Sequence, residues 1–264
     1  VNVSGGSSKV RYFGGASYYN EDANLPGTDL NKYSLRMGID ADITNDLTAS
    51  LTLSGDSRKD TRPFNREDGN PASLNGAFES LLRTPRWIPP YINGLPVRNG
   101  GSIVSHPIEI NNQNSRIENT GSNLVINAAL EYKVPIVKGL KMRLAYNQSE
   151  TNNYSNQLRK NYFLYDFVTI GSNGNLLSNV PTGRTLVNNQ ERLQEEYSND
   201  KSYQLNGSIS YARIFGKHDI NALAVYEVAE GESYGFRALR ENQLIPGYDL
   251  QPGFSEAQDG TFGF

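Results

Sequence analysis

Pairs of strands with alternating hydrophobicity, each joined by a tight turn, recur along this chain, and the clearest pair covers residues 33–56. Successive side chains of a strand point to opposite faces, so alternation separates apolar residues from polar ones. Each strand is about ten residues long, the length that crosses a bilayer at a tilt of about 45°. The pattern therefore favours a membrane β-barrel over a soluble sandwich. The apolar face of this pair consists of Tyr33, Leu35, Met37, Ile39, Ala41, Ile43, Leu47, Ala49, Leu51 and Leu53.

Two further strand pairs follow the same pattern, at residues 124–146 and 203–228. A stub at residues 1–4 and a strand over 10–20 precede them, which makes about seven strands and a stub. The facing of the 10–20 strand is ambiguous, because two sets of aromatic and aliphatic residues compete for its apolar side. The predicted fold is all-β: an antiparallel, up-and-down transmembrane β-barrel segment within one barrel domain covering residues 1–264.

Long polar segments separate the strand pairs, at about residues 57–120 and 154–199, and we predict both as loops. Long loops at one end and short turns at the other are typical of outer-membrane barrels, whose long loops are extracellular. The first loop carries a helical pattern over residues 71–84, with Pro71 in its first turn and Pro85 after its end. The tail beyond about Arg237 is predicted to begin a further loop.

Composition excludes several classes of protein. The net charge is −3 without a basic block, which argues against nucleic acid as a partner. Cysteine is absent, so thiolate metal sites and disulfides are excluded, and we predict no metal site. Mean hydropathy is −0.57, and no apolar run reaches the 18 or so residues of a membrane helix. A barrel fits these numbers, because its lumen face and loops are polar.

Tyrosines lie at both ends of the predicted strands, on the apolar face. Such a placement is typical of the two aromatic girdles of a membrane barrel, although the general preference of Tyr for strands is an alternative. The predicted girdle residues are Tyr33, Tyr146, Tyr203 and Tyr226 at the loop ends, and Tyr132 and Tyr211 at the turn ends.

Polar residues on the opposite face are candidates for a lumen surface. Arg36, Asp40 and Asp42 share this face, and we expect them to form a lumen or plug-contact network rather than an acid pair for catalysis. The two histidines, His106 and His218, lack partners at catalytic or metal-binding spacing, and we predict both to be solvated. We predict no catalytic residues, no cofactor and no enzymatic activity.

Three segments carry a family resemblance. Residues 3–13 and 32–44 resemble early barrel strands of SusC/RagA-like TonB-dependent transporters, and residues 77–85, followed by 89–91, resemble the first large outer loop of that family. The resemblance implies a 22-stranded barrel in the bacterial outer membrane, an N-terminal plug, and docking by TonB from the periplasm. It also implies a SusD-like surface lipoprotein as a lid and uptake of glycans or peptides as nutrients.

The chain departs from a full member of that family, because it shows neither a plug nor a TonB-contacting segment and only part of a barrel. Both ends look like cuts within a longer chain, and the missing neighbours would be needed to pair the edge strands in lipid. Two alternatives stay open. A soluble β-rich carbohydrate-binding module would cover the apolar face with a second sheet. A small self-contained outer-membrane barrel would close within this chain.

The largest predicted loop contains the candidate ligand-binding residues, Arg86, Trp87, Tyr91 and Asn93. Aromatic rings stack on sugars, while Arg and Asn satisfy hydroxyls or carboxylates. The competing interpretation is that Trp87 and Tyr91 pack the loop onto its own helix or onto the lid.

Overall fold

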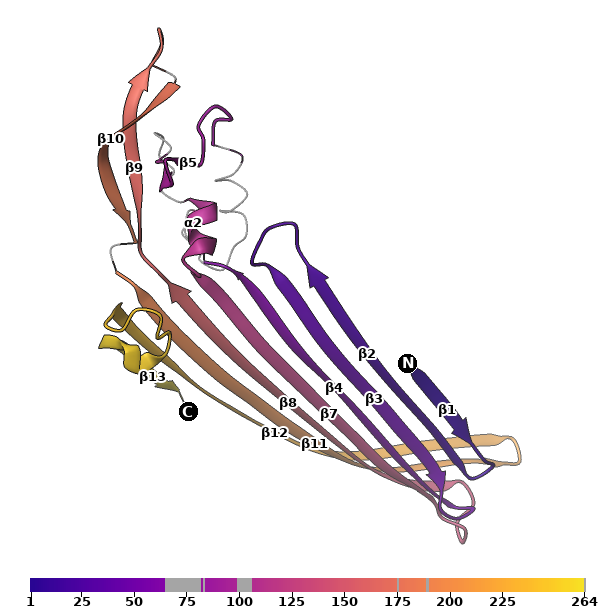
Figure 1. The fold of residues 1–264 in the computed structure, drawn as a ribbon. Helices are drawn as coiled ribbons and strands as arrows, with labels where there is room; N and C mark the ends of the chain where they lie inside the picture. The colour runs from indigo at the N-terminus through magenta and orange to yellow at the C-terminus, as the bar shows by residue number, and fades with distance from the viewer. Residues whose placement is uncertain (65–81, 83, 99–105, 175, 189, 264) are drawn as a thin grey trace.

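The computed structural model describes residues 1–64, 82, 84–98, 106–174, 176–188 and 190–263. Nine strands form one antiparallel sheet in the order β1-β2-β3-β4-β7-β8-β11-β12-β13, which confirms the predicted all-β, antiparallel fold (Figure 1). The first strands are β1 (Asn2–Gly6), β2 (Val10–Asp22), β3 (Asp29–Asp42) and β4 (Leu47–Pro63). The others are β7 (Arg116–Lys133), β8 (Leu140–Arg159), β11 (Arg192–Phe215), β12 (His218–Gln243) and β13 (Phe254–Gly263).

The register of the sheet follows the hydrophobic alternation. Ile39 pairs with Leu51, and Leu51 pairs with Ala128, so apolar residues stay on one side across neighbouring strands. A shift of one residue would move every apolar side chain to the other face. We call the side that carries these residues the apolar face, and the opposite side, which carries Arg36 and Asp40, the polar face.

The pairing of β2 resolves the ambiguity in its facing. Tyr12 lies opposite Ile39 and Tyr18 opposite Tyr33, so both tyrosines belong to the apolar face. Phe13 therefore points to the polar face, where it lies opposite Gly38. A Cβ atom on Gly38 would clash with the Phe13 ring in its present position, so a larger residue there would displace that ring.

The prediction of a loop over residues 154–199 is wrong. β8 and β11 pair continuously from Leu140 opposite Tyr211 to Arg159 opposite Arg192. The residues between them form a hairpin of β9 (Tyr162–Ile170) and β10 (Leu176–Val187). Backbone hydrogen bonding continues the strands here even though polar residues stand at both parities, so no hydrophobic alternation marks them. The tail likewise adds β13, where the sequence had indicated only a loop.

The remaining elements gather at the end of the sheet opposite the short turns (Figure 1). They are β5 (Tyr91–Ile92), β6 (Leu95–Pro96), helix α2 (Pro107–Asn112) and the short 3-10 helix η1 (Gln251–Gly253). The predicted helix over 71–84 lies almost wholly outside the described residues, and α2 was not expected. No helix in the described ranges combines the length and apolarity needed to cross a membrane.

Buried side chains concentrate at this loop end and not in the middle of the sheet. One cluster joins α2 to the β9–β10 hairpin and consists of Ile110, Tyr162, Leu164 and Val187. A second consists of Leu158, Leu193 and Phe254. These two buried clusters therefore pack the elements beyond the main sheet against the loop ends of its strands.

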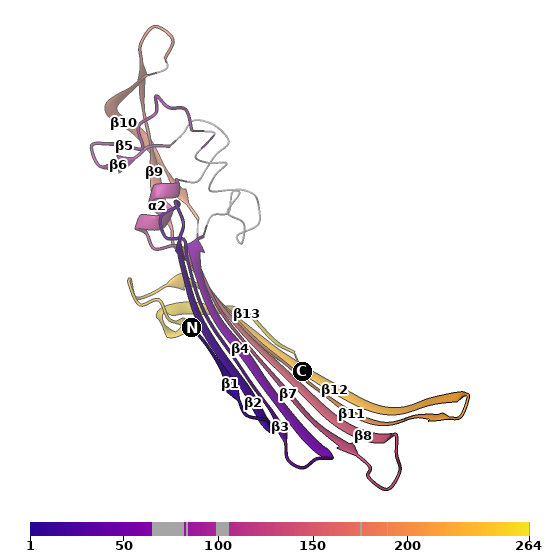
Figure 2. The same cartoon turned by 90° about the vertical axis from the view of Figure 1, so that its right-hand side faces the viewer.

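The apolar face of the main sheet is uncovered. Leu51 and Leu130 are each 46% exposed, and Leu144 is 49% exposed. The sheet is curved (Figure 2), and the other sheets of the described chain are two-stranded and lie at the loop end. The second sheet that a soluble sandwich requires is thus absent from the described residues. β1 and β13 form open edges, so the sheet also does not close into a small barrel within these residues.

Candidate functional site

Tyr91 anchors the β5–β6 hairpin to α2. Its hydroxyl donates to Glu109 Oε1 at 2.6 Å and accepts from Asn112 Nδ2 at 3.0 Å. Its ring centroid lies 5.3 Å from that of His106. The packing interpretation therefore describes Tyr91 better than ligand stacking does, although the helix it packs against is α2 and not the one expected from the sequence.

Glu109 is the centre of this anchor. It also accepts hydrogen bonds from Asn112 and Gln113, at 3.1 and 3.2 Å. Burial acts to raise the pKa of the Glu109 carboxyl, but the hydrogen bonds from Tyr91, Asn112 and Gln113 outweigh burial and leave that pKa below its ordinary value. Burial, reinforced by the bond to Glu109, raises the pKa of the Tyr91 hydroxyl.

The prediction that His106 is solvated is wrong. Its side chain is buried, and Nδ1 accepts the backbone N–H of Glu109 at 3.1 Å, which caps the N-terminus of α2. Nε2 lies 3.0 Å from the Pro90 carbonyl and donates to it, because Nδ1 is the acceptor. Pro107 in the first helical turn was the available signal, since proline is common there. His218, by contrast, is exposed at the start of β12.

The other loop candidates do not converge with Tyr91. Trp87 is 62% exposed. Asn93 occupies the turn between β5 and β6 with a φ of 51°, and its side chain donates to the Asn179 carbonyl at 3.5 Å. Among residues 84–98, no hydrogen bond, ion pair or ring contact joins Arg86 or Trp87 to Tyr91. A ligand role for Arg86 and Trp87 stays a prediction.

All six predicted girdle tyrosines lie on the apolar face. Tyr146 and Tyr203 stack with their centroids 6.3 Å apart, and Tyr33 lies 4.9 Å from Tyr18. Beyond Tyr146 and Tyr203, toward the loops, the same face carries charged and amide side chains. The ladder there pairs Glu150 with Lys201 and Asn152 with Asn199. These polar pairs therefore interrupt the apolar surface of β8 and β11 on the loop side of the two tyrosines.

The predicted lumen residues share the polar face but form no common network. The Arg36 guanidinium lies 5.7 Å from the Phe13 ring centroid. Asp42 accepts from the Thr48 hydroxyl at 3.0 Å. Within residues 1–64, no hydrogen bond or ion pair links Arg36 to Asp40 or Asp42.

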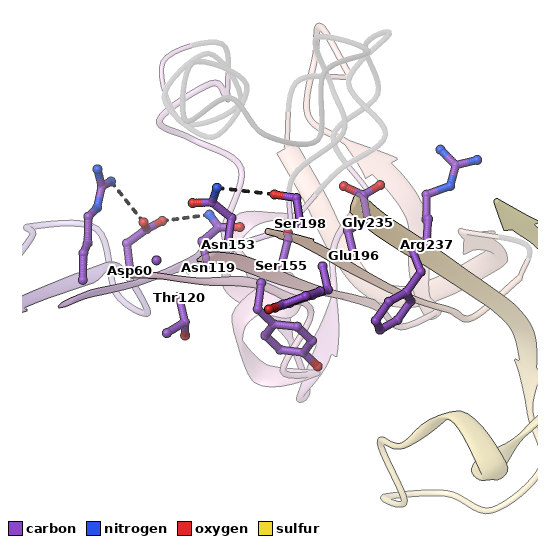
Figure 3. Close-up of a pocket in the computed structure, with 14 residues that line it drawn as sticks. Asp60, Asn119, Thr120, Asn153, Ser155, Glu196, Ser198, Gly235 and Arg237 are labelled. Atoms are coloured by element: carbon purple, nitrogen blue, oxygen red, sulfur yellow. Dashed lines mark hydrogen bonds and ion pairs between the residues drawn. The ribbon is translucent and has the colours of Figure 1, made fainter. Parts of the chain in front are cut away.

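A hollow on the polar face lies nearer the loop end and was not anticipated from the sequence (Figure 3). Its volume is about 560 Å³, within the range typical of ligand sites. We call it the trough and define it by two adjacent ladder rows that cross five strands. One row is Arg58, Gly121, Asn153, Ser198 and Gly235. The next is Asp60, Asn119, Ser155, Glu196 and Arg237.

Charged groups stand at both ends of the trough. Arg58 forms an ion pair with Asp60 at 3.0 Å, and Asp60 also accepts from Asn119 Nδ2 at 2.9 Å. Glu196 and Arg237 lie directly opposite one another at the far end. Amide, hydroxyl and glycine residues lie between them, with Asn153 donating to Ser198 at 3.4 Å. No hydrophobic alternation marks this site in the sequence, because polar residues stand at both parities of β8 and β11 around it.

No known protein family model matches this chain, and no curated protein matches it. Several solved structures match the chain in fold. The RagAB peptide transporter matches with a TM-score of 0.65 and 17% identity, over 99% of this chain and 28% of that one. The RagAB peptide importer in its "closed-closed" state gives 0.65, 19% identity and the same coverage, and its "open-open" state gives 0.65 and 18% identity, over 99% and 27%. The chain thus has the fold of just over a quarter of a peptide-transporter chain.

Proposed function

We propose that this chain is part of the barrel wall of a SusC/RagA-like, TonB-dependent importer in a bacterial outer membrane. The observation that supports this most strongly is the single belt of exposed apolar side chains across the sheet, bounded by tyrosines. From Tyr203 to Tyr211, nine residues of β11 at a tilt of about 45° span about 20 Å, close to the apolar height of an outer-membrane barrel. The polar face would line the lumen.

The plug, the TonB contact, the lid and the substrate follow from the family resemblance and stay proposals. A plug elsewhere in the whole protein would be pulled by TonB, and a SusD-like lipoprotein would cover the loop end. The substrate would be a glycan or a peptide; the similar RagAB structures are described as peptide transporters. The packed loop assembly around Glu109 supports the lid contact, because it gives the loops a defined surface.

Aspartate substitution on the two faces of β4 tests the proposal. Leu51 is on the apolar face and Thr52, the next residue, is on the polar face. In the full-length protein, Leu51→Asp would place a carboxylate in lipid, so we expect little folded protein in the outer-membrane fraction. Thr52→Asp is the matched control and should assemble normally. Equal assembly of both variants would contradict a membrane-facing apolar side.

A further inference from the structure

The trough separates charged groups from neutral ones along its length. Its middle consists of two glycines, two asparagines and two serines, and its ends each combine an acid with a base. Four ladder steps of about 4.8 Å separate β4 from β12, so Asp60 and Arg237 are about 19 Å apart. Glu196, on β11, is three steps or about 14 Å from Asp60. A long ligand with a neutral body and charged ends would match this distribution.

The neutral middle is suited to amide groups. Asn119, Asn153, Ser155 and Ser198 offer both donors and acceptors, as a peptide backbone requires. The bond from Asn153 to Ser198 is long, at 3.4 Å, so exchanging it for a ligand contact costs little. Gly121 and Gly235 add no side chain to the trough. A Cβ atom on Gly235 would lie 2.7 Å from the Tyr197 carbonyl oxygen, so the close approach of β11 itself requires glycine there.

Aromatic side chains are missing from the two rows of the trough. Tyr154, Tyr197 and Phe236 border it, but the register places them on the apolar face. Tyr197 packs against Tyr234 and Phe236 there, at 6.1 and 5.9 Å. Saccharides are commonly bound by stacking on aromatic rings, and the trough offers no such platform.

We propose that the trough binds an extended oligopeptide of about six residues whose free ends meet the charged groups. Six residues at about 3.3 Å each span the distance between the two ends. Arg58 and Arg237 would meet a carboxylate terminus, and Asp60 and Glu196 an ammonium terminus. This inference rests on the proposed import function and selects peptides from its two substrate classes.

Calorimetric titration of the full-length protein in detergent tests the proposal. The probes are a six-residue peptide of Ala and Ser with free termini, its acetylated and amidated form, and a neutral linear hexasaccharide. Asn153→Leu removes the central amide, and Ser198→Ala is the milder second variant. Asn147→Leu is the matched control, because Asn147 is on the same strand and face and bonds to Asn127 at 2.6 Å outside the trough. Arg58→Gln removes the cationic group from one end of the trough and leaves Asp60 in place.

We expect Asn153→Leu to weaken the free peptide about tenfold or more and Asn147→Leu to change it less than about twofold. Arg58→Gln should weaken the free peptide but not the blocked one. Absence of binding by the free peptide, or equal losses from Asn153→Leu and Asn147→Leu, would overturn the proposal. If Asn153→Leu fails to fold, Ser198→Ala takes its place, and unchanged binding of the free peptide by Ser198→Ala would overturn the proposal.

Two outcomes separate this inference from the import function. Binding of the hexasaccharide, reduced by Asn153→Leu, would show that the trough takes sugars, which overturns the peptide inference and leaves the importer intact. Equal assembly of Leu51→Asp and Thr52→Asp would defeat the importer itself, and that measurement involves no ligand.

Discussion

Hydrogen bonds of single side chains hold the loop end together, and the sequence pattern does not predict them. Glu109 lies in a helix of six residues, too short for hydrophobic periodicity to reveal it. Its partners Tyr91 and Gln113 lie on either side of it in the chain, and only the folded loop shows that Tyr91 reaches it. Tyr91 packs against α2, whereas the packing interpretation named the helix of its own loop or the lid. His106 was expected to be solvated because histidine is an uncommon helix cap.

The lowered pKa of Glu109 predicts that the loop end loses stability in acid. A carboxyl with a lowered pKa in the folded state stabilises that state above its unfolded pKa, and the contribution disappears as the pH falls through the folded value. The ordinary pKa is 4.5, so the loss should begin below that pH. Glu109→Gln should cost about 1 kcal/mol of local stability at pH 7.

Hydrogen exchange of residues 106–115 measures this effect. Dividing the rates of the variant by those of the native protein at each pH removes the intrinsic pH dependence of exchange. The ratio should exceed one at pH 7 and fall toward one in acid below pH 4.5. A ratio that stays constant from pH 7 to pH 3.5 would show that the Glu109 charge does not stabilise the loop.

At the scale of strands, the sequence predicts an element only where the environments of its two faces differ. The three hairpins near the turns were found because residues of the apolar face and of the polar face alternate in hydrophobicity. Above Tyr146, β8 continues with Gln148, Ser149 and Glu150, which are polar at both parities, so the alternation vanishes while the backbone pairing persists. The trough lies in this upper part and was missed for the same reason.

The β9–β10 hairpin offers a prediction about how the loop end is held. Leu164 is 1% exposed and contributes to the cluster around Ile110, whereas its neighbour Phe163 is 38% exposed. Leu164→Ala should cost about 2–5 kcal/mol of local stability, because it leaves a cavity. Phe163→Ala should cost much less. Limited proteolysis of the folded protein should therefore cut within residues 160–188 much faster in Leu164→Ala, and equal cleavage of both variants would show that the buried cluster does not hold the hairpin.

At the scale of the whole molecule, the tyrosines reveal how the sheet is tilted in the proposed membrane. Tyr33 belongs to a ladder row that continues through Ser122 and Asn152. Tyr146, on the same strand as Asn152, lies six residues nearer the turns. If Tyr33 and Tyr146 mark one interface, the hydrogen-bonded rows must run obliquely to the membrane plane. Tyr12 and Tyr132 show an offset in the same sense at the turn end, since the row of Tyr12 meets β7 at Ala128.

This geometry predicts that Tyr33 and Asn152, which share one ladder row, lie at different depths in the membrane. It also predicts that Tyr33 and Tyr146, which belong to different rows, lie at the same depth. Three ladder steps of about 4.8 Å at a tilt of about 45° separate Tyr33 and Asn152 by about 10 Å along the membrane normal. Single cysteines, introduced into a chain that has none, can carry spin labels for oxygen-accessibility depth measurements in lipid. Labels at positions 33 and 146 should report the same interfacial depth, and a label at position 152 should lie in water. Equal depths of the labels at 33 and 152, with the label at 146 deeper in the bilayer, would contradict this prediction. The strands would then run parallel to the membrane normal, and Tyr33 and Tyr146 would mark no common interface.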